Sequence, residues 1–263
     1  MRNIIKNIIE GRKNGVAGGL SVGDEKDIIT ILVKDENYTN IQDIVDEVIV
    51  MFIAGTKTVQ GTTTNFIANY TNRPNFRERL HQELDPFVDK IKHDFVNAYH
   101  YEMTEDLEYT KYAYYEVMRL DTPFSVSSTS SVTEPCKISG IPLEPNDAFF
   151  INMGAMHRDK DQWQKPDEFI PERFNPESEY FLRPDGGKRN PLAFTPFLGG
   201  QRICLGKTFA ELTLKYTLPM YTYFFEFEWV DKSFYENKPV YEFGALKNPE
   251  LKMNFIIKNK VEA

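Results

Sequence analysis

The sequence predicts a mainly helical protein with small β-sheets, an α+β fold, and three observations carry this prediction. Apolar residues recur at helical spacing in several long stretches, most clearly from Ile41 to Ile53. Shorter stretches between positions 124 and 151 read as strands, because proline and Asn-Asp separate them. Of the 263 residues 41% are hydrophobic, which is enough for one large domain or two small ones.

Charge and cysteine content narrow the class of protein. The net charge of -8 and the pI of about 5.2 argue against nucleic acid as a main partner. Two widely separated cysteines do not indicate a disulfide framework, so a reducing compartment is expected. The longest apolar run, Val48 to Gly55, is too short to cross a bilayer, and the first residues do not resemble a signal peptide. These features alone indicate only a soluble, globular, intracellular protein.

The chain begins with residues that are typical of a helix end and then of a polar, glycine-rich connector, over positions 1–26. Its glycines are Gly11, Gly15, Gly18, Gly19 and Gly23. Asn40 is the expected N-cap of a long central helix that covers about 40–71 and ends before Pro74. Glycine inside a helix costs about 1 kcal/mol relative to alanine. Gly55 therefore predicts a kink or a close approach in this helix.

Two further helices follow. The first covers about 75–98, with an interruption at Pro86 and with His81 and His93 in solvent. The second covers 105–120, and Thr104 is its expected N-cap in a box-like Thr104-x-x-Leu107 that lacks the usual acid. Glu116 and Arg119 lie three positions apart on this helix, so their side chains share one face. Such a pair alone is a weak signal.

Strands and loops are expected over much of the remaining chain. The segment 175–196 is typical of a loop, and a last helix starts at about Lys207. The expected strands lie at 124–132, 137–142, 148–151, 223–230 and 251–257.

Cys204 is the residue whose surroundings indicate chemistry. It lies in a glycine-flanked loop directly before the last helix, where free amide N–H groups and the helix dipole stabilise a thiolate. Such a thiolate is a nucleophile, a zinc ligand or an axial ligand of haem iron. Zinc requires about four ligands, and the four histidines form no cluster with Cys136, whereas a nucleophile requires a histidine base that sequence alone does not locate. The glycines favour the haem ligand, because they let the backbone approach a flat ring.

The loop Phe197-x-x-Gly200-x-Arg202-x-Cys204-x-Gly206 resembles the cysteine-ligand loop of the cytochrome P450 family at every fixed position. Three further motifs of that family follow the same order along the chain. They are Ala54-Gly55-x-x-Thr58, Glu116-x-x-Arg119 and Pro171-Glu172-Arg173-Phe174. The resemblance extends from about Asp27, in a short helix before the central one, to Ile257.

Family members are about twice this length. The resemblance therefore implies one partial domain over 1–263, the C-terminal, haem-binding portion of a eukaryotic-type fold without its N-terminal half. Within it we expect the central helix at about 40–71, the Glu-x-x-Arg helix at about 105–120 and the cysteine-ligand loop at 197–206.

The resemblance also implies roles for individual residues. Cys204 would be the metal ligand, and Cys204 and Thr58 would be the catalytic residues. Glu116, Arg119 and Arg173 would form a buried structural network that positions the ligand loop and does no chemistry. The cofactor would be haem b, iron protoporphyrin IX, and the residues expected to contact it are Cys204, Arg202, Phe197, Gly200, Gly206, Ala54 and Gly55.

The sequence departs from the family pattern in two places. Lys57 stands where an acidic residue usually precedes the threonine, and Val59 replaces a second hydroxyl, which weakens the expectation of proton delivery to dioxygen. The stretch Phe124 to Ser131 offers only hydroxyls where relatives often carry an arginine or histidine for a haem propionate. Arg202 would then carry more of that contact. Phe243-Gly244-Ala245 lies where relatives line the substrate pocket.

The implied function is a haem-thiolate monooxygenase that inserts one oxygen atom of dioxygen into an apolar small molecule. Electrons would come from NADPH through a separate reductase, since the chain has no nucleotide-binding glycine loop. The basic residues Arg183, Lys188 and Arg189 form either a solvated turn or a docking patch for an acidic electron donor.

Two alternatives remain. One is a haem-thiolate isomerase or dehydratase that needs no external electrons, which Lys57 supports. The other is a truncated, non-catalytic helical interaction module, and this chain alone is expected to bind haem poorly. A full-length relative implies the cytosolic face of the endoplasmic reticulum membrane. For this chain, membrane association would require a missing N-terminal segment.

Overall fold

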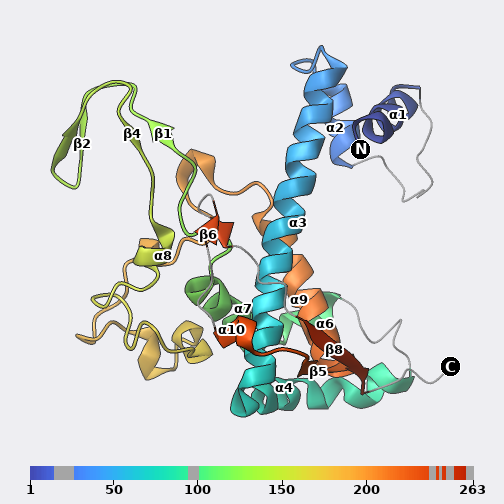
Figure 1. Ribbon diagram of the computed structural model, residues 1–263, viewed down its shortest axis with the longest axis vertical. Coiled ribbons are helices and arrows are strands. Elements are labelled where there is room, and N and C mark those ends of the chain that lie inside the picture. Colours follow the sequence, from blue (N-terminus) through green and yellow to red (C-terminus); the bar gives the residue numbers. More distant parts are fainter. Residues whose placement is uncertain (15–26, 94–100, 237–240, 243–244, 247–251, 259–263) are drawn as a thin grey trace. The chain divides into compact units, whose positions relative to one another are not determined.

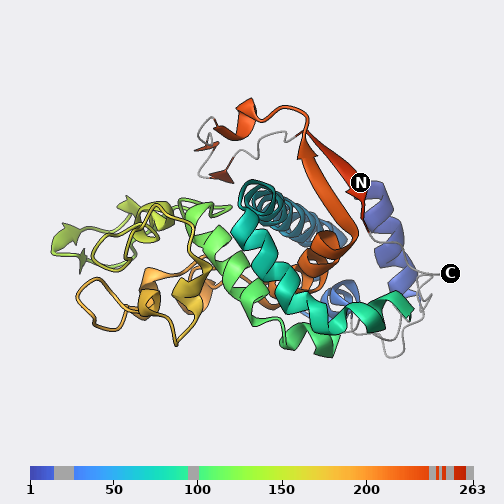
Figure 2. The same cartoon turned by 90° about the horizontal axis from the view of Figure 1, so that it is seen from below.

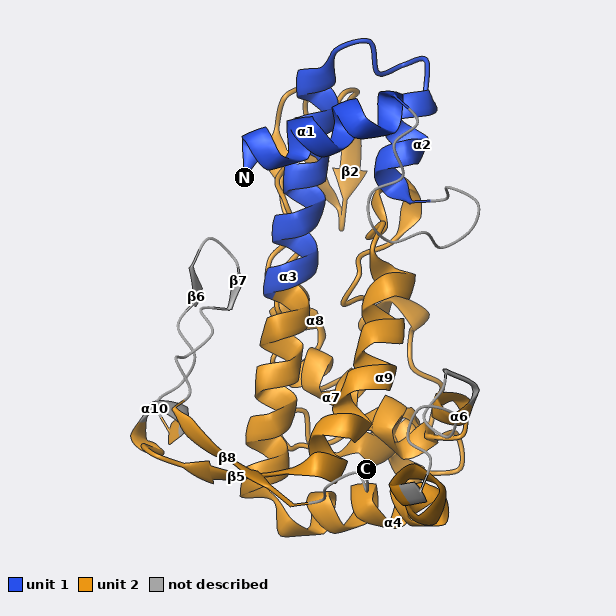
Figure 3. Ribbon diagram, turned by 90° about the vertical axis from the view of Figure 1, so that its right-hand side faces the viewer, with its two compact units in different colours: residues 1–57 blue, residues 58–263 orange. Residues whose placement is uncertain are grey.

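The structure is a computed structural model that describes residues 1–14, 27–93, 101–236, 241–242, 245–246 and 252–258 (Figure 1). The chain divides into two compact units, residues 1–57 and residues 58–263 (Figure 3). The boundary falls inside the long helix α3 (Ile41–Asn72), which follows the predicted helix of about 40–71 closely. The fold class is confirmed, because helices dominate and the sheets are small.

The first unit contains α1 (Arg2–Lys13), α2 (Ile28–Lys34) and the beginning of α3. These helices share a small apolar core of Ile5, Ile9, Leu32, Ile44 and Val45. The side chain of Asp27 caps α2 by accepting the Thr30 N–H at 3.0 Å. Asn40 caps α3 as predicted, since its side-chain oxygen accepts the Gln42 N–H at 2.9 Å. The expected connector is wrong at Gly11, which lies inside α1, and its other glycines lie outside the described residues.

In the second unit, α4 (Pro74–His93), α7 (Glu108–Leu120) and α9 (Lys207–Phe224) pack around the end of α3, and α6 (Tyr101–Glu105) packs against α9. In Figure 2, α4, α7 and α9 lie side by side. Their apolar faces form the main core, because residues at helical spacing on each helix point toward the same interior. The core consists of Phe66, Ile67, Tyr70, Phe76, Leu80, Ala113, Tyr114, Val117, Met118, Leu214, Leu218 and Phe227.

Helix α4 corrects two predictions. It continues through Pro86 and is not interrupted there. The proline ring removes only the hydrogen bond to the carbonyl of Gln82, and because both residues are exposed, water can satisfy that carbonyl. His81 is half-buried and not solvated, since its Nε2 lies 2.8 Å from the Tyr70 hydroxyl. The side chain of His93 lies outside the described residues, as does the predicted end of this helix at 94–98.

The predicted helix of 105–120 is α7, which starts three residues later than expected, at Glu108, while Glu105 ends the separate helix α6. Thr104 lies inside α6 and does not cap α7. The capping acid comes instead from α4, since the Glu83 carboxylate accepts the Thr110 N–H at 2.9 Å and also the Tyr109 N–H. A side chain 27 residues away thus satisfies two backbone donors at the start of α7.

The strands form small antiparallel pairs: β1 (Ser130–Ser131) with β4 (Ala148–Phe149), β2 (Cys136–Ile138) with β3 (Ile141–Leu143), β5 (Phe225–Trp229) with β8 (Met253–Ile257), and β6 (Tyr241–Glu242) with β7 (Ala245–Leu246). Several strand predictions were too long. The expected strand at 137–142 is a hairpin, because Ser139 and Gly140 have φ of 50° and 82° and form a tight turn that such pairs favour. Positions 223 and 224 belong to α9.

Between β4 and α9 the chain forms a long, mostly irregular segment, as predicted for 175–196. It contains the short helix α8 (Met153–Met156) and the 3₁₀ turns η1 (Pro171–Phe174), η2 (Glu179–Phe181), η3 (Pro191–Ala193) and η4 (Gly200–Arg202). Turn η1 packs against α7, which brings the Pro171–Phe174 motif to the Glu-x-x-Arg helix. A short helix, α10 (Ser233–Glu236), follows β5.

Among the residues that the structure describes, no helix is both long enough and apolar enough to cross a membrane.

Candidate functional site

The loop that carries Cys204 is a closed turn at the start of α9. The Cys204 N–H donates to the Phe197 carbonyl at 2.9 Å, so the two ends of the loop are held together. Leu198 and Gly200 have φ of 60° and 66°, the left-handed region in which glycine costs least. The loop ends at Gly206, whose carbonyl accepts the Ala210 N–H at 2.8 Å as α9 begins.

The sulfur of Cys204 is open to its surroundings. Cys204 is a free, exposed cysteine, and an added Cβ at Gly206 would lie 3.9 Å from its Sγ. Apolar side chains around it are exposed as well: Leu205 is 80% exposed and Phe209 67%. Apolar surface of this kind beside a free thiol fits a flat, apolar group held through sulfur. The residues present therefore fit a haem.

The apolar surface continues along α9. A shallow hollow of about 640 Å³ is lined by Thr208, Leu212, Thr213, Tyr216 and Thr217, one exposed face of the helix. Arg202 is exposed in η4, so its guanidinium is accessible to a carboxylate. Phe197 is partly buried and packs against the main core, which anchors the beginning of the loop.

The motif residues Ala54, Gly55 and Thr58 lie on α3. Helix α3 runs continuously through Ala54, Gly55 and Thr58, and the kink expected at Gly55 stays a prediction. An added Cβ at Gly55 would meet nothing within 4 Å. Ala54 and Gly55 belong to the first unit and Thr58 to the second, and their roles stay predictions. Thr58 is partly buried, and its carbonyl accepts the Thr62 hydroxyl at 3.2 Å, whereas Lys57 is exposed.

Glu116, Arg119 and Arg173 meet in a fully buried cluster. Arg119 donates to both carboxylate oxygens of Glu116, at 2.7 and 2.8 Å, and Arg173 donates to one of them at 3.2 Å. Each of these side chains in the two ion pairs is 0% exposed. The carboxylate also accepts the Ile170 N–H at 2.8 Å. Burial lowers the pKa of Arg173, and the Glu116 carboxylate acts in the opposite direction.

The same arginines hold the irregular segment by its backbone. Arg119 donates to the carbonyls of His157 and Pro166 at 2.8 and 2.7 Å. Arg173 donates to the carbonyls of Gln164, Lys165 and Glu168. Buried guanidinium groups need such partners, because an unpaired charge in the interior is very costly. The cluster thus fixes the path of the chain that leads toward Cys204.

Arg189 extends this cluster, so the expectation that it lies in a solvated turn is wrong, whereas the docking patch for an electron donor stays a prediction. Its guanidinium lies 4.1 Å from the centre of the Trp163 ring and donates to the carbonyls of Arg173 and Phe181, both at 2.6 Å. Burial, reinforced by the positive charge of Arg173, lowers the pKa of Arg189 to about 10. Arg183 is paired with Asp185, whereas Lys188 is exposed.

His157 is a residue to which sequence reasoning assigned no role. Its side chain is fully buried, and its Nε2 accepts the Thr195 N–H at 3.1 Å. The only sequence signal was the position of His157-Arg158-Asp159 between the two halves of the buried cluster. Among the described residues, no group of three or more His, Cys, Asp and Glu side chains is arranged to hold a metal ion.

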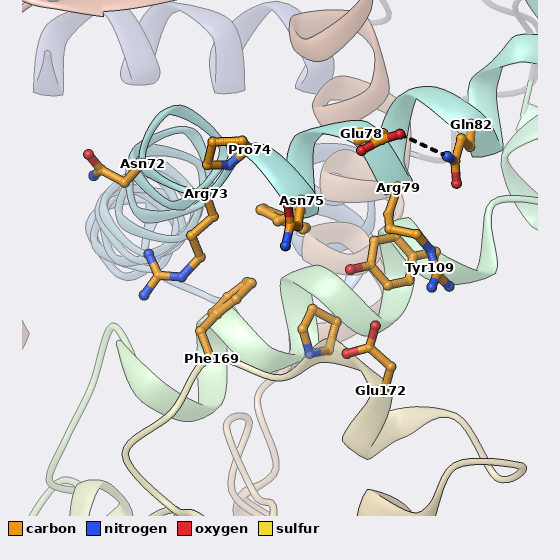
Figure 4. A pocket seen from close by; sticks show the side chains of 12 residues that line it. Asn72, Arg73, Pro74, Asn75, Glu78, Arg79, Gln82, Tyr109, Phe169 and Glu172 are labelled. Carbon is orange, nitrogen blue, oxygen red and sulfur yellow. Dashed lines mark hydrogen bonds between the residues drawn. The ribbon is translucent and has the colours of Figure 1, made fainter.

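A second hollow, of about 690 Å³, lies apart from the cysteine loop (Figure 4). It is bounded by the end of α3, the start of α4, the start of α7 and η1. Two arginines lie over aromatic rings in it: Arg73 is 5.0 Å from the centre of Phe169, and Arg79 is 4.8 Å from that of Tyr109. None of its lining residues comes from the loop 197–206.

Comparison with known proteins gives the family. The family model described as Cytochrome P450 matches residues 1–255. The 5-epiaristolochene 1,3-dihydroxylase of Nicotiana tabacum is 31% identical over 231 residues, which are 85% of this chain and 42% of that protein. Thromboxane-A synthase of Mus musculus is 29% identical over 188 residues, 72% of this chain and 33% of that protein.

A solved structure agrees in fold. The structure titled retinoic acid bound cyanobacterial CYP120A1 superposes with a TM-score of 0.75 at 21% identity, over 97% of this chain and 55% of that one. The chain thus spans less than half the length of these curated relatives. The match to the family model over nearly every residue is decisive, and the chain belongs to the cytochrome P450 family.

Proposed function

We propose that the protein is the haem-ligating portion of a haem-thiolate monooxygenase, with the Cys204 thiolate as the axial ligand of haem b. The observation that carries this proposal is the exposed sulfur of Cys204, held at the start of α9 in a hydrogen-bonded loop with apolar surface around it. Membership of the family implies an oxidative function, and hydroxylases are among the relatives it resembles.

The residues of this chain would divide the work. Cys204 would hold the iron, Gly200 and Gly206 would let the ring approach the backbone, and Arg202 would pair with a propionate. Phe197 would keep water from the sulfur. The hydroxyl of Thr58 would hold a proton on the substrate side.

When bound, the haem supplies one-electron chemistry and oxygen activation, by which one atom of O₂ enters an apolar substrate and the other leaves as water. Its electrons would come from NADPH through a separate reductase.

The test is the spectrum of the reduced, carbon-monoxide-treated protein after incubation with haem. We expect the far-shifted Soret band of thiolate ligation in the unmodified chain and in Cys136→Ala, which removes the other exposed cysteine, and its loss in Cys204→Ala. Because the chain spans less than half of its curated relatives, weak haem affinity is expected, so the titration should extend to excess haem. A band that persists in Cys204→Ala would overturn the assignment of the ligand.

Lys57 favours a second candidate, an isomerase or dehydratase that uses no external electrons. The exposed ammonium beside Thr58 replaces the carboxylate expected for proton delivery. Turnover of a peroxide substrate without NADPH and reductase would select this reaction, whereas turnover that requires both would select monooxygenation. If the chain binds no haem at any haem concentration, the remaining alternative is the non-catalytic interaction module.

A further inference from the structure

The ring of His157 lies in a closed interior site between the buried cluster and the cysteine loop. His157 is 0% exposed, and its ring packs against Phe194, with centroids 5.3 Å apart and an angle of 41° between the planes. Its backbone carbonyl accepts a hydrogen bond of 2.8 Å from Arg119. The Arg119 guanidinium therefore restrains the backbone of His157, and the Phe194 ring restrains its side chain.

The ring in turn holds the segment that leads into the loop. Its Nε2 accepts the Thr195 N–H at 3.1 Å. The Thr195 carbonyl accepts the Leu198 N–H at 3.0 Å, and the Phe197 carbonyl accepts the Cys204 N–H at 2.9 Å. Pro196 has no N–H, so the Thr195 N–H is the last backbone donor before the loop begins. An unbroken series of hydrogen bonds and short chain links thus connects Arg119 to Cys204.

The chemistry of the ring suits this contact. An imidazole nitrogen that accepts a hydrogen bond carries no proton, so the ring is neutral and its proton is on Nδ1. Burial first, and then the positive charges of Arg119 and Arg158, lower the pKa of His157 to about 4, while the carbonyls of Arg119 and Met118 act in the opposite direction. Near neutral pH the acceptor is therefore always available.

We propose that His157 is a positioning residue for the ligand loop: its Nε2 holds the Thr195 amide and so fixes the start of the turn that presents Cys204. This inference rests on the proposed function only where it concerns haem, because the hydrogen bond to Thr195 and its effect on the loop exist in the haem-free chain.

Three substitutions separate the effect of the acceptor atom Nε2 from the effect of the flat ring. His157→Gln places a carbonyl oxygen near the position of Nε2, His157→Asn is too short to do so, and His157→Phe keeps a flat ring without an acceptor. Site-resolved amide hydrogen exchange on the haem-free chain is the measurement. A lost hydrogen bond corresponds to roughly a tenfold change in local opening. We expect Thr195 and Cys204 to exchange about tenfold faster in the Phe and Asn variants, and within about twofold of the unmodified chain in the Gln variant.

Leu84→Ala is the control for a general loss of stability, because Leu84 lies in a second core cluster, formed by α4, α6 and the end of α9. It should leave the two amides protected relative to the global unfolding rate. If His157→Phe does not fold, the Asn and Gln variants decide the question, since both are polar and differ by one methylene. Unchanged exchange at Thr195 in the Asn variant would overturn the hydrogen bond, and unchanged exchange at Cys204 would overturn its effect on the loop.

Measurements on haem-loaded protein distinguish the positioning role of His157 from the proposed haem-thiolate function. In haem-loaded protein the Asn and Phe variants should lose at least half of the thiolate Soret band, and the Gln variant should keep it. Absence of that band from the unmodified chain would contradict the proposed function, yet the exchange data would still decide the role of His157. A full band in every variant, with fast exchange at Thr195, would overturn the positioning role.

Discussion

The buried cluster of Glu116, Arg119 and Arg173 and the loop of Cys204 lie in the same unit but have opposite surroundings. Every donor and acceptor in the cluster that the structure describes has a partner, and its side chains are fully buried. The loop exposes its sulfur and its apolar side chains. The difference teaches that stability and reactivity are held by different residues, so substitutions in the two regions should have separable effects.

Removing the acid of the cluster should have the largest effect. Glu116→Ala leaves two guanidinium groups buried without their shared carboxylate, and we expect the free energy of unfolding to fall by about 3–5 kcal/mol. Chemical denaturation measures it. Glu108→Ala, on the exposed side of the same helix, should change it by less than about 0.5 kcal/mol. Equal effects of the two substitutions would show that the cluster does not stabilise the fold.

Acid should weaken the fold through His157, which joins the two regions. The pKa of His157 is about 4 in the folded protein and 6.5 in the unfolded chain, so only the unfolded chain takes up a proton between these values. The resulting stability is present above pH 6.5 and is lost as the pH falls toward 4, at a cost of about 3 kcal/mol. The free energy of unfolding of His157→Gln, measured by chemical denaturation at each pH, should fall less between pH 6.5 and pH 4 than that of the unmodified chain, by that amount. Parallel curves would contradict a neutral buried ring.

Substitution of a left-handed glycine in the Cys204 loop should lower the free energy of unfolding by less than the two changes above. Gly200→Ala places a side chain at φ 66°, and an added Cβ meets no atom within 4 Å, so the cost is conformational and amounts to about 1–2 kcal/mol. Gly199→Ala is the matched control, because Gly199 is extended at φ −162° and equally open. It should cost less than about 0.5 kcal/mol. Thermal unfolding of both variants tests the difference, which disappears if the left-handed turn is not formed.

The smallest effect on stability should come from the residue with the largest proposed effect on function. Cys204 is exposed and fills no core position, so Cys204→Ala should change the free energy of unfolding by less than about 0.5 kcal/mol. The same denaturation experiment as for Glu116→Ala measures it, without haem. A loss above 2 kcal/mol would show that the sulfur has a structural role and that the two regions are not separable.

The sequence predicted what depends on nearby residues. The periodicity of apolar side chains located α3 within one residue at each end, and the spacing of Glu116 and Arg119 placed them on one face of α7. The third member of the cluster, Arg173, was predicted from the family resemblance of its motif and not from any local rule.

Contacts between distant segments were beyond such rules. Glu83 caps α7 from another helix, and nothing near Leu107 indicates it. Arg189 looked like a surface charge, but the indole of Trp163 and the carbonyl of Arg173 bury it. The bond from Thr195 to His157 joins residues 38 positions apart, so only the folded chain reveals it. Tertiary structure also overrode the propensity of Pro86 to interrupt a helix.

The arginines of the cluster contact backbone oxygens of the irregular segment, and this has a consequence for protein engineering. Because Arg173 contacts the carbonyls of Lys165 and Glu168, the side chains at these two positions are not part of that contact and are exposed. Lys165 has a φ of 43°, in the left-handed region that β-branched residues avoid, so a high share of folded clones is expected from a library at Glu168. Purification tags or crosslinking groups introduced there would leave the course of the chain intact, while the same diversity at position 173 would abolish expression.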